Sequence, residues 1–255
     1  MSNRRLLIVM ALFLTSCNSN AFENETPFRS VKEIVQHVEK LEKNTPEEKR
    51  LAYYESVLAK SEKGDLHSTL LLFGMYYPGN FVKRDRRKAL ELAHQAIDRG
   101  FFPMYIVPGV CFEFGMCGSE KNSLKAYQMY IKGAKRGYAD SAQKLCYSLI
   151  LPEFYTELPK QIKKNNYQEA LKWCKTGREK DKSTAGENLN VEASIYITQE
   201  FSGFDEKKSC DLYRKSADLG EEYSLEPTIN CIKRGFFGDD KSLLIDQYLK
   251  KFGYR

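Results

Sequence analysis

A helix-length pattern of small and large residues recurs five times in this sequence, and no other feature constrains the fold as much. Each copy opens with a charged residue followed by a small one, at Lys88-Ala89, Lys125-Ala126, Glu169-Ala170, Lys208-Ser209 and Lys241-Ser242. Successive copies lie 37, 44, 39 and 33 residues apart. Periods of this size are typical of repeat proteins, in which each copy is one supersecondary unit that stacks on its neighbours.

Three further columns keep a fixed offset from the small residue. Three positions later the residue is large and apolar: Leu92, Met129, Trp173, Leu212 and Ile245. Seven positions later it is small in all copies but the last: Ala96, Gly133, Gly177, Ser216 and then Leu249. Eleven positions later it is glycine in all copies but the third: Gly100, Gly137, Asp181, Gly220 and Gly253.

These offsets predict a helix with one packed face and a defined end. Offsets of zero, three and seven fall on one side of a helix, where small residues let a neighbouring helix approach closely. The glycine is typical of the left-handed residue that follows a helix C-terminus. In the stretch KAYQMYIKGAKRGYADSAQ (125–143), Gly137 ends one helix and the next begins almost at once. We therefore expect stacked helical hairpins.

Residues ahead of the charged–small pair carry a family resemblance. They are Tyr76, Gly79, Val82 and Asp85 in the first copy, and Tyr196 and Asp205 in the fourth, at the same spacing. With the columns above, they resemble the Sel-one-like repeat (SLR) family, relatives of the tetratricopeptide repeat, over about residues 65–253. The resemblance implies an all-α fold, a right-handed α-solenoid of about five SLR helical hairpins, with a concave surface that docks protein partners.

Three departures from the repeat are visible. Pro103 and Pro108 fall in the first helix of the second copy, which Pro108 should kink or shorten. The third copy carries an insertion, residues 152–165, between its two helices. The last copy is short, as expected of a terminal repeat that ends the stack.

An extra helical hairpin is predicted before the repeats. Ser30 to Glu33 and Thr45 to Glu48 both read as capping boxes, in which side chains satisfy the free N–H groups at a helix start. They predict helices over about residues 31–43 and 46–62, with Gly64 ending the second. We interpret residues 30–64 as an N-terminal helical cap and residues 65–255 as the solenoid.

The first residues read as an export signal. Arg4 and Arg5 precede an apolar segment, Leu6 to Leu14, which is shorter than the roughly 20 residues that span a bilayer. Leu14-Thr15-Ser16-Cys17 resembles the bacterial lipobox, which implies that residues 1–16 are removed as a lipoprotein signal peptide and that Cys17 is acylated, with palmitate among its fatty chains. The alternative is an ordinary signal peptide with an incidental cysteine.

The same resemblance implies a location. By analogy with lipoprotein sorting, Asn18 after the acylated cysteine favours the outer membrane, in a cell with two membranes. Residues 17–29 would then be the lipidated cysteine and a flexible tether. We expect a protein of the cell envelope, lipid-anchored and facing the periplasm.

Six cysteines remain when Cys17 is set aside. An even number in an exported chain suggests disulfides, although six cysteines allow 15 connectivities. Our hypothesis is three local bridges, Cys111 with Cys117, Cys146 with Cys174, and Cys210 with Cys231. The alternative is six small buried thiols.

The sequence offers little that could catalyse a reaction. His37, His67 and His94 have no metal-ligand spacing, and no HExxH, nucleophile elbow or phosphate-binding glycine loop occurs. One SxxK stretch, Ser141 to Lys144, formally resembles that of penicillin-binding enzymes but lacks their companion motifs. Without residues 1–16, basic residues outnumber acidic ones by four, which does not indicate nucleic acid. We predict no catalytic residue, no cofactor and no metal, and hence no enzyme.

Two groups of residues are candidates for partner binding. Arg84, Arg86 and Arg87 lie in a basic run that fits an acidic partner or lipid headgroups, or alternatively a solvated turn. Aromatic residues outside the repeat columns are the other group, since aromatics are enriched at interface hot spots: Phe101, Phe102, Tyr105, Phe154 and Tyr155. Packing between repeats is an equal alternative for Phe101 and Phe102, whereas Phe154 and Tyr155, in the insertion, favour an interface.

The resemblance also suggests a role. A small exported SLR lipoprotein is similar to immunity proteins that neutralise antibacterial effectors delivered into the periplasm, such as phospholipases. Such a protein binds its protein partner without catalysis and is expected to be monomeric when unbound. The alternatives are a scaffold or regulator of an envelope protein complex and, third, a penicillin-interacting SLR protein.

Overall fold

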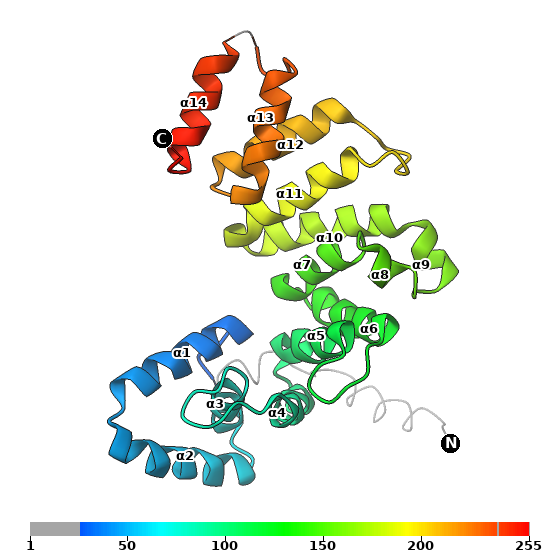
Figure 1. Ribbon diagram of the computed structural model, residues 1–255. Helices are drawn as coiled ribbons and strands as arrows, with labels where there is room; N and C mark the ends of the chain where they lie inside the picture. The colour runs from blue at the N-terminus through cyan, green and yellow to red at the C-terminus, as the bar shows by residue number, and fades with distance from the viewer. Residues whose placement is uncertain (1–25, 239, 255) are drawn as a thin grey trace, which may run out of the picture. The chain divides into compact units, whose positions relative to one another are not determined.

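A computed structural model describes residues 26–238 and 240–254 of the chain. This part contains 14 α-helices and three short 3-10 helices, η1 to η3, and no β-strand (Figure 1). It forms two compact units, unit 1 up to Phe101 and unit 2 from Phe102 onward, which are described separately. No helix in the described residues combines the length and the apolar character needed to cross a membrane.

Unit 1 consists of four helices: α1 (Val31–Asn44), α2 (Glu47–Glu62), α3 (Leu66–Tyr76) and α4 (Arg86–Asp98). Helix α3 packs against the other three and is the core of the unit. Phe73 and Leu70 of α3 are fully buried. A Cβ atom on Gly74 would lie 2.7 Å from the Val38 side chain of α1, so a glycine is needed where these two helices meet.

The first two helices lie where the sequence predicted them. Ser30 caps α1 by accepting a hydrogen bond from the Glu33 N–H, and Gly64 ends α2 with a left-handed φ of +95°. The second predicted capping box is wrong. The Thr45 hydroxyl donates 2.7 Å to the Leu41 carbonyl, and α2 begins after Pro46 without a side-chain cap. Thr45 thus gives a hydrogen bond to a carbonyl at the C-terminus of α1. The last carbonyls of a helix lack partners within the helix, as do the first N–H groups.

Unit 2 contains four helical hairpins. Their helices are α5 (Ile106–Phe114) with α6 (Ser123–Lys135), α7 (Ala139–Ser148) with α10 (Asn166–Lys180), α11 (Ala185–Tyr196) with α12 (Glu206–Asp218), and α13 (Leu225–Lys233) with α14 (Lys241–Lys251). The 3-10 helices η1 (Phe102–Tyr105), η2 (Lys182–Thr184) and η3 (Glu222–Ser224) lead into α5, α11 and α13. Below, α5, α7, α11 and α13 are called first helices, and α6, α10, α12 and α14 second helices.

The small columns lie at helix contacts, as predicted. The first small residue of the pattern is fully buried in four copies: Ala89, Ala126, Ala170 and Ser209. The small residue seven positions later meets the next first helix: a Cβ on Gly133 would lie 2.8 Å from that of Ser141, and the Ser216 hydroxyl accepts a hydrogen bond from Ser224 at 2.7 Å. In the last copy Ser242 is exposed, so α14 does not follow the pattern.

The turn inside the hairpin is also repeated. The residue before the second helix is Asp85, Asn122 or Asp205, and each side chain accepts the N–H three residues on. The backbone N–H of the same residue bonds back to the end of the first helix, from Asp85 to Tyr76 at 3.0 Å and from Asp205 to Tyr196 at 2.8 Å. The constant tyrosine-to-aspartate spacing in the sequence reflects this turn.

The prolines of the second copy shorten its first helix. Pro103 lies in η1, and Pro108 is the third residue of α5, which is nine residues long. In the first turn of a helix the missing proline N–H costs little, because that group would have no partner in any case.

The insertion is folded. It forms two short helices, α8 (Pro152–Tyr155) and α9 (Lys160–Lys164). Phe154 and Leu158 are each 2% exposed and belong to the same hydrophobic cluster as Tyr130 and Trp173. The insertion therefore packs onto unit 2.

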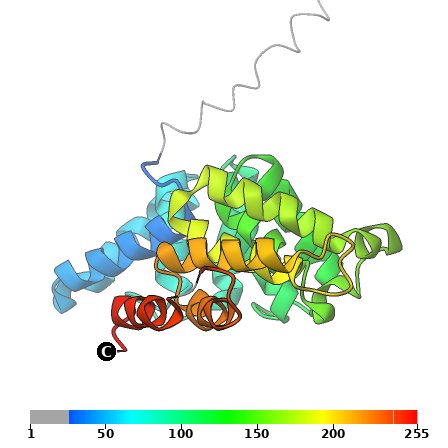
Figure 2. The ribbon, with the colours of Figure 1, turned by 90° about the horizontal axis from the view of Figure 1, so that it is seen from above.

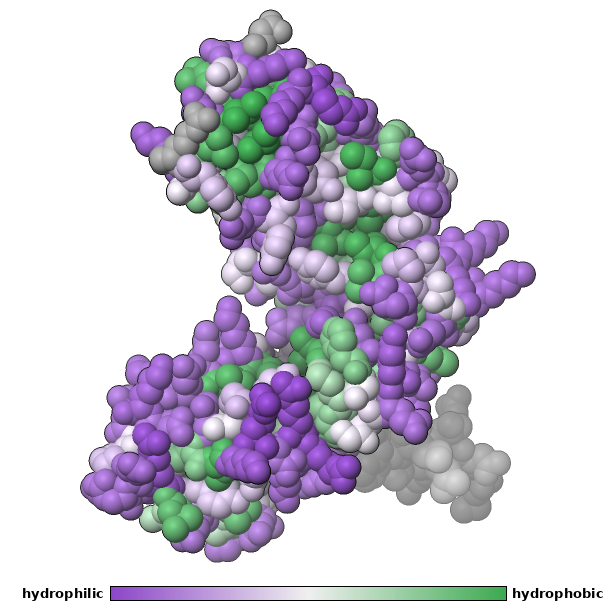
Figure 3. Space-filling model, in the orientation of Figure 1, coloured by the Kyte–Doolittle hydropathy of each residue, from purple (hydrophilic) through white to green (hydrophobic). Residues whose placement is uncertain are grey.

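The last hairpin closes the C-terminal end of unit 2. Helices α13 and α14 lie side by side in both ribbon views (Figures 1 and 2). Tyr248 is buried in the small core between them, and Leu244, Ile245 and Phe252 pack around it half-buried. Apolar surface gathers over these helices in Figure 3.

Candidate protein-interaction surface

The first helices of unit 2 form an open pocket of about 350 Å³. Ile106, at the start of α5, forms one side. Asp140, Gln143, Lys144 and Tyr147 of α7 form the other, and their spacing of three, four and seven places them on one face of that helix. This pocket, with the neighbouring side chains of α11 and η3, is called the first-helix surface below.

A buried carboxylate supports the pocket from beneath. Glu113 of α5 is 6% exposed and accepts hydrogen bonds from the Tyr130 hydroxyl at 2.6 Å and the Ser148 hydroxyl at 2.7 Å. The Lys144 ammonium lies 3.6 Å from the same carboxylate. A buried charge is tolerated when it is paired and hydrogen-bonded, and this one joins α5, α6 and α7.

Lys144 also lies over an exposed aromatic ring. Its Nζ is 5.3 Å from the ring centre of Phe114, the last residue of α5. Phe114 is 56% exposed. The pocket is therefore flanked by a large apolar side chain that the core of the unit does not use.

Carboxylates from the following two hairpins lie near α7. The Gln143 amide donates a hydrogen bond to Glu187 of α11. Burial, and then the negative charges of Glu187 and Glu221, raise the pKa of Tyr147 to about 12, so its phenol stays protonated at neutral pH. Tyr223, in η3, is 84% exposed. Polar groups, carboxylates and a free aromatic ring thus lie together.

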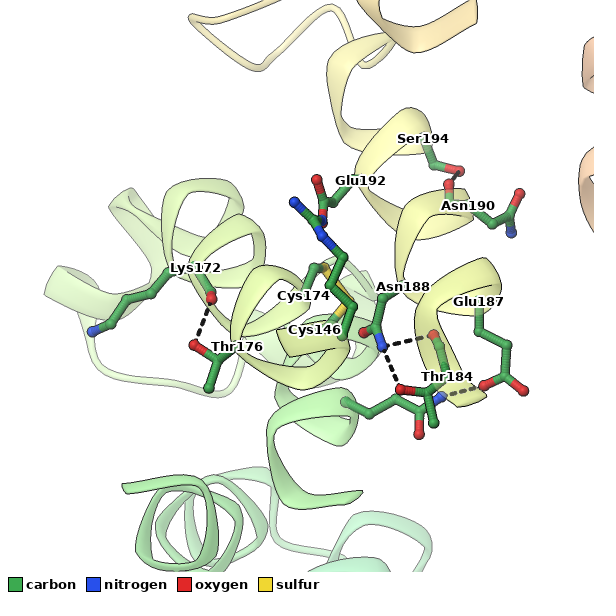
Figure 4. Close-up of a disulfide and its surroundings, with 12 residues drawn as sticks. Cys146, Lys172, Cys174, Thr176, Thr184, Glu187, Asn188, Asn190, Glu192 and Ser194 are labelled. Atoms are coloured by element: carbon green, nitrogen blue, oxygen red, sulfur yellow. Dashed lines mark hydrogen bonds and ion pairs between the residues drawn. A yellow bond between two sulfur atoms is a disulfide. The ribbon is translucent and has the colours of Figure 1, made fainter. Parts of the chain in front are cut away.

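A disulfide and a charged pair stabilise the helices behind this surface (Figure 4). Cys146 of α7 is bonded to Cys174 of α10. The Arg178 guanidinium of α10 is paired with the Glu192 carboxylate of α11. Helices α7 and α11 are therefore each tied to α10 by more than apolar packing.

All six described cysteines are paired. The other bridges are Cys111–Cys117, between α5 and the turn after it, and Cys210–Cys231, between α12 and α13. These are the pairs hypothesised from the sequence, and the alternative of six free thiols does not describe this structure.

The aromatic candidates from the sequence lie mostly in the core. Phe154 is 2% exposed, so its assignment to an interface is wrong. Tyr155 is half-buried and packs against the same cluster. Phe101 and Tyr105 are 7% and 9% exposed, and Phe102 is half-buried under the Arg136 guanidinium, 4.6 Å from its ring centre. Packing between helices accounts for these rings.

The basic run lies on the surface of unit 1. Arg84, Arg86 and Arg87 have exposed side chains at the start of α4. Asp85 between them caps α4 by accepting the Lys88 N–H at 3.0 Å. This geometry is that of the solvated turn, and binding by the arginines stays a prediction.

The SxxK stretch does not have the geometry of a catalytic serine. Ser141 is fully buried against Gly133, and Lys144 is engaged by Glu113. His67 stacks on Phe28 at 5.3 Å, His37 meets the edge of the same ring, and the His94 side chain is exposed. Within the described residues no cluster of histidine, cysteine or acidic side chains could hold a metal ion. The predicted signal peptide (1–16) and Cys17 lie outside the described residues.

Sequence reasoning missed Glu113, Phe114 and Tyr223. A signal for Glu113 was available, because it is the single charge in the apolar stretch from Phe101 to Cys117. Phe114 and Tyr223 belong to no repeat column, and an aromatic residue outside the columns can be exposed or, like Phe154, buried.

Comparison with known proteins identifies the repeats. The sequence profile of the Sel1 repeat matches four segments, residues 69–101, 109–138, 157–181 and 202–221. No curated protein matches the chain.

Two solved structures have a similar fold. One is a protective antigen of uropathogenic Escherichia coli strains that displays an SLR fold, with a TM-score of 0.63 and 20% identity over 79% of this chain and 40% of the antigen chain. The other is a Sel1 repeat protein from Oxalobacter formigenes, with a TM-score of 0.57 and 21% identity over 73% of this chain and 70% of that one. The all-α solenoid fold is thereby shown, and this chain spans well under two thirds of the E. coli antigen.

Proposed function

We propose that this chain, which contains Sel1 repeats, binds a protein partner without catalysing a reaction, through the first-helix surface of unit 2. Sel1 repeats typically form helical scaffolds for protein–protein interaction. The observation that carries the proposal is that Phe114 and Tyr223, at 56% and 84% exposure, lie beside a pocket while most other candidate aromatics are buried. Exposed aromatic side chains at a pocket are typical anchors of protein interfaces.

The surface is also well suited to binding by its rigidity. Glu113 joins three helices, and the Cys146–Cys174 bridge holds α7 against α10. A preformed surface loses little conformational entropy when a partner docks, which favours tight binding.

The specific role that we propose is that of an immunity protein. The chain would be anchored to the outer membrane by lipidated Cys17, face the periplasm, and occlude an antibacterial effector delivered there, such as a phospholipase. The lipobox-like residues 14–17 and the likeness of an exported SLR chain to such proteins support this role. A scaffold of an envelope complex would use the same surface and is the alternative.

A competition experiment tests the role. A strain lacking this gene should be killed by sibling cells that secrete the effector, and the wild-type gene should restore survival. The double variant Phe114→Glu/Tyr223→Glu should fail to restore it, whereas Leu51→Glu, at an equally exposed apolar residue of unit 1, should succeed. Unaltered survival of the deletion strain would contradict the immunity role.

The anchor is tested separately. Metabolic labelling with palmitate should mark the wild-type protein and place it in the outer-membrane fraction. The variant Cys17→Ser should lose both the label and the membrane location. Labelling that persists in this variant would contradict acylation at Cys17.

A further inference from the structure

The two helix layers of unit 2 carry opposite net charge. The first helices, with η2 and η3, contain six acidic and three basic residues. The second helices contain 14 basic and six acidic residues. The chain as a whole has a net charge of +6, so the first-helix layer differs in sign from the rest of the protein.

Ion pairs inside the unit already use two of these carboxylates. Glu113 is engaged by Lys144, and Glu192 by Arg178. Both acids are buried, and their charges are therefore satisfied internally. The same pairs also consume the charges of Lys144 and Arg178.

Two other carboxylates next to the pocket have neutral partners. Glu187 accepts a hydrogen bond from the Gln143 amide, and Glu221 accepts one from the backbone N–H of Tyr223 at 3.4 Å. No lysine or arginine in the described part of the chain forms an ion pair with either of them. Their negative charge is therefore available to a partner.

Apolar groups lie directly beside these carboxylates. The side chains of Glu221 and Leu219 both approach Gly186, to 3.2 and 3.6 Å from where its Cβ would be, and Gly186 precedes Glu187. Leu219 is 61% exposed, and Tyr223 more so. The pocket itself adds Ile106 and the ring of Tyr147. Negative charge and apolar area thus occur on one continuous part of the first-helix surface.

We propose that the first-helix surface binds a cationic segment of the partner, with lysine or arginine against Glu187 and Glu221 and a neighbouring apolar side chain on Tyr223 and in the pocket. This inference rests on the proposed function and adds the chemistry of the partner to it. Complementary charge speeds association and excludes partners of the wrong sign. An acidic segment would meet uncompensated carboxylates here and would be repelled.

Two labelled peptides test the sign of the preference. Both have a central Phe-Leu pair, flanked on each side by four arginines in one peptide and by four glutamates in the other. Fluorescence anisotropy would measure their binding to the mature chain carrying Cys17→Ser, which keeps it in solution. The arginine peptide should bind at least tenfold more tightly at 50 mM NaCl, and its affinity should fall at 300 mM. The net positive charge of the protein predicts the opposite preference, so tighter binding of the arginine peptide cannot result from the overall charge.

Charge reversal locates the binding site. Glu187→Lys/Glu221→Lys should weaken binding of the arginine peptide at least tenfold, and Glu187→Gln/Glu221→Gln should weaken it less. The control Glu55→Lys/Glu62→Lys changes the net charge equally at exposed positions of α2 in unit 1 and should leave the affinity within twofold. Circular dichroism would verify that each variant is folded. Equal binding of the two peptides, or equal loss in the control, would overturn the inference.

The two double variants distinguish failure of this inference from failure of the proposed function. If Phe114→Glu/Tyr223→Glu abolishes protection but Glu187→Lys/Glu221→Lys does not, the surface is correct and its cationic preference is wrong. If neither double variant affects protection, the proposed surface itself is wrong.

Discussion

Units 1 and 2 are built from similar helical hairpins but are stabilised differently. In unit 1, α3 takes the place of a first helix. It is buried on nearly all sides and rich in leucine, with Phe73 and Met75 fully buried. The described residues of unit 1 contain no cysteine. Polar side chains are buried in both units, Ser68 and Thr69 in α3 and Ser141 and Asn188 in unit 2, but the three disulfides all lie in unit 2.

Disulfides in unit 2 add to apolar burial, which includes a large cluster around Tyr130 and Trp173. In a linear stack each hairpin contacts only its neighbours, so each contact must be stable by itself. A leucine-rich helix supplies that stability by burial of apolar area. Where small and polar residues occupy the contact, less apolar area is buried, and a disulfide that restricts the unfolded chain makes up part of the difference.

The largest expected effect is loss of packing in unit 1. Phe73→Ala should lower the free energy of unfolding of unit 1 by about 3–5 kcal/mol, since it empties a fully buried site. Hydrogen exchange should accelerate in α1 to α4 and remain unchanged in unit 2. The exposed Phe114→Ala is the control and should change stability by less than about 0.5 kcal/mol. A similar loss in both variants would contradict the assignment of α3 as the core.

Removal of a disulfide should destabilise unit 2 and leave the stability of unit 1 unchanged. Cys146→Ala/Cys174→Ala removes a bridge that spans 28 residues and should cost unit 2 about 3–4 kcal/mol. Cys111→Ala/Cys117→Ala, whose bridge spans six residues, should cost about 2 kcal/mol. Urea unfolding monitored by hydrogen exchange would separate the units. Equal destabilisation of unit 1 would show that the two units do not unfold independently.

A smaller effect concerns the same repeat position in the two units. Unit 1 has Ala96 where unit 2 has Gly133, and a methyl group on Gly133 would clash with Ser141. Gly133→Ala should therefore destabilise unit 2 by about 1–3 kcal/mol in thermal or urea unfolding. The double variant Gly133→Ala/Ser141→Gly should recover most of this loss, because the clash is removed. No recovery would place the cause of the loss elsewhere.

The smallest effect is a pH dependence confined to unit 1. All three histidines are in unit 1, and burial against Phe28 lowers the pKa of His67 below its usual value. The unfolded chain therefore binds a proton first, and stability that is present above about pH 6.5 is lost as the pH falls through the lower folded pKa. Unfolding at pH 7.5 and 5 should show this loss in unit 1, and His67→Gln should reduce it. The exposed His94→Gln should leave it unchanged.

Much of the fold could be predicted because it is encoded by short-range patterns. The column of Ala89, Ala126, Ala170 and Ser209 was assigned to a buried face from spacing alone, and all four residues are fully buried. The turn capped by Asp85 or Asp205 also depends on residues close in sequence. Such features recur in each copy at fixed offsets from the small residue, so the sequence shows the same pattern several times.

The candidate surface could not be predicted in the same way. Phe154 and Tyr223 are both aromatic residues outside the columns, yet one is buried in the core and the other is exposed. Each ring is exposed or buried according to whether other parts of the chain cover it. Phe154 is buried through contacts with residues distant in sequence, such as Tyr130 and Trp173. Thr45 illustrates the same limit locally, because its hydroxyl could satisfy either of two adjoining helix ends.

The sequence by itself determined that this protein is a stack of helical hairpins, because periodic small and large residues and capping side chains act within one or two turns of helix. It also supported the hypothesis of three local cysteine pairs, without excluding other connectivities. Only the tertiary structure decided which aromatic rings are exposed, that Glu113 is buried and partnered, and that Glu187 and Glu221 both lie near Tyr147 with neutral hydrogen-bond partners. Exposure and local net charge depend on residues from different repeats, and these residues come together only when the repeats pack.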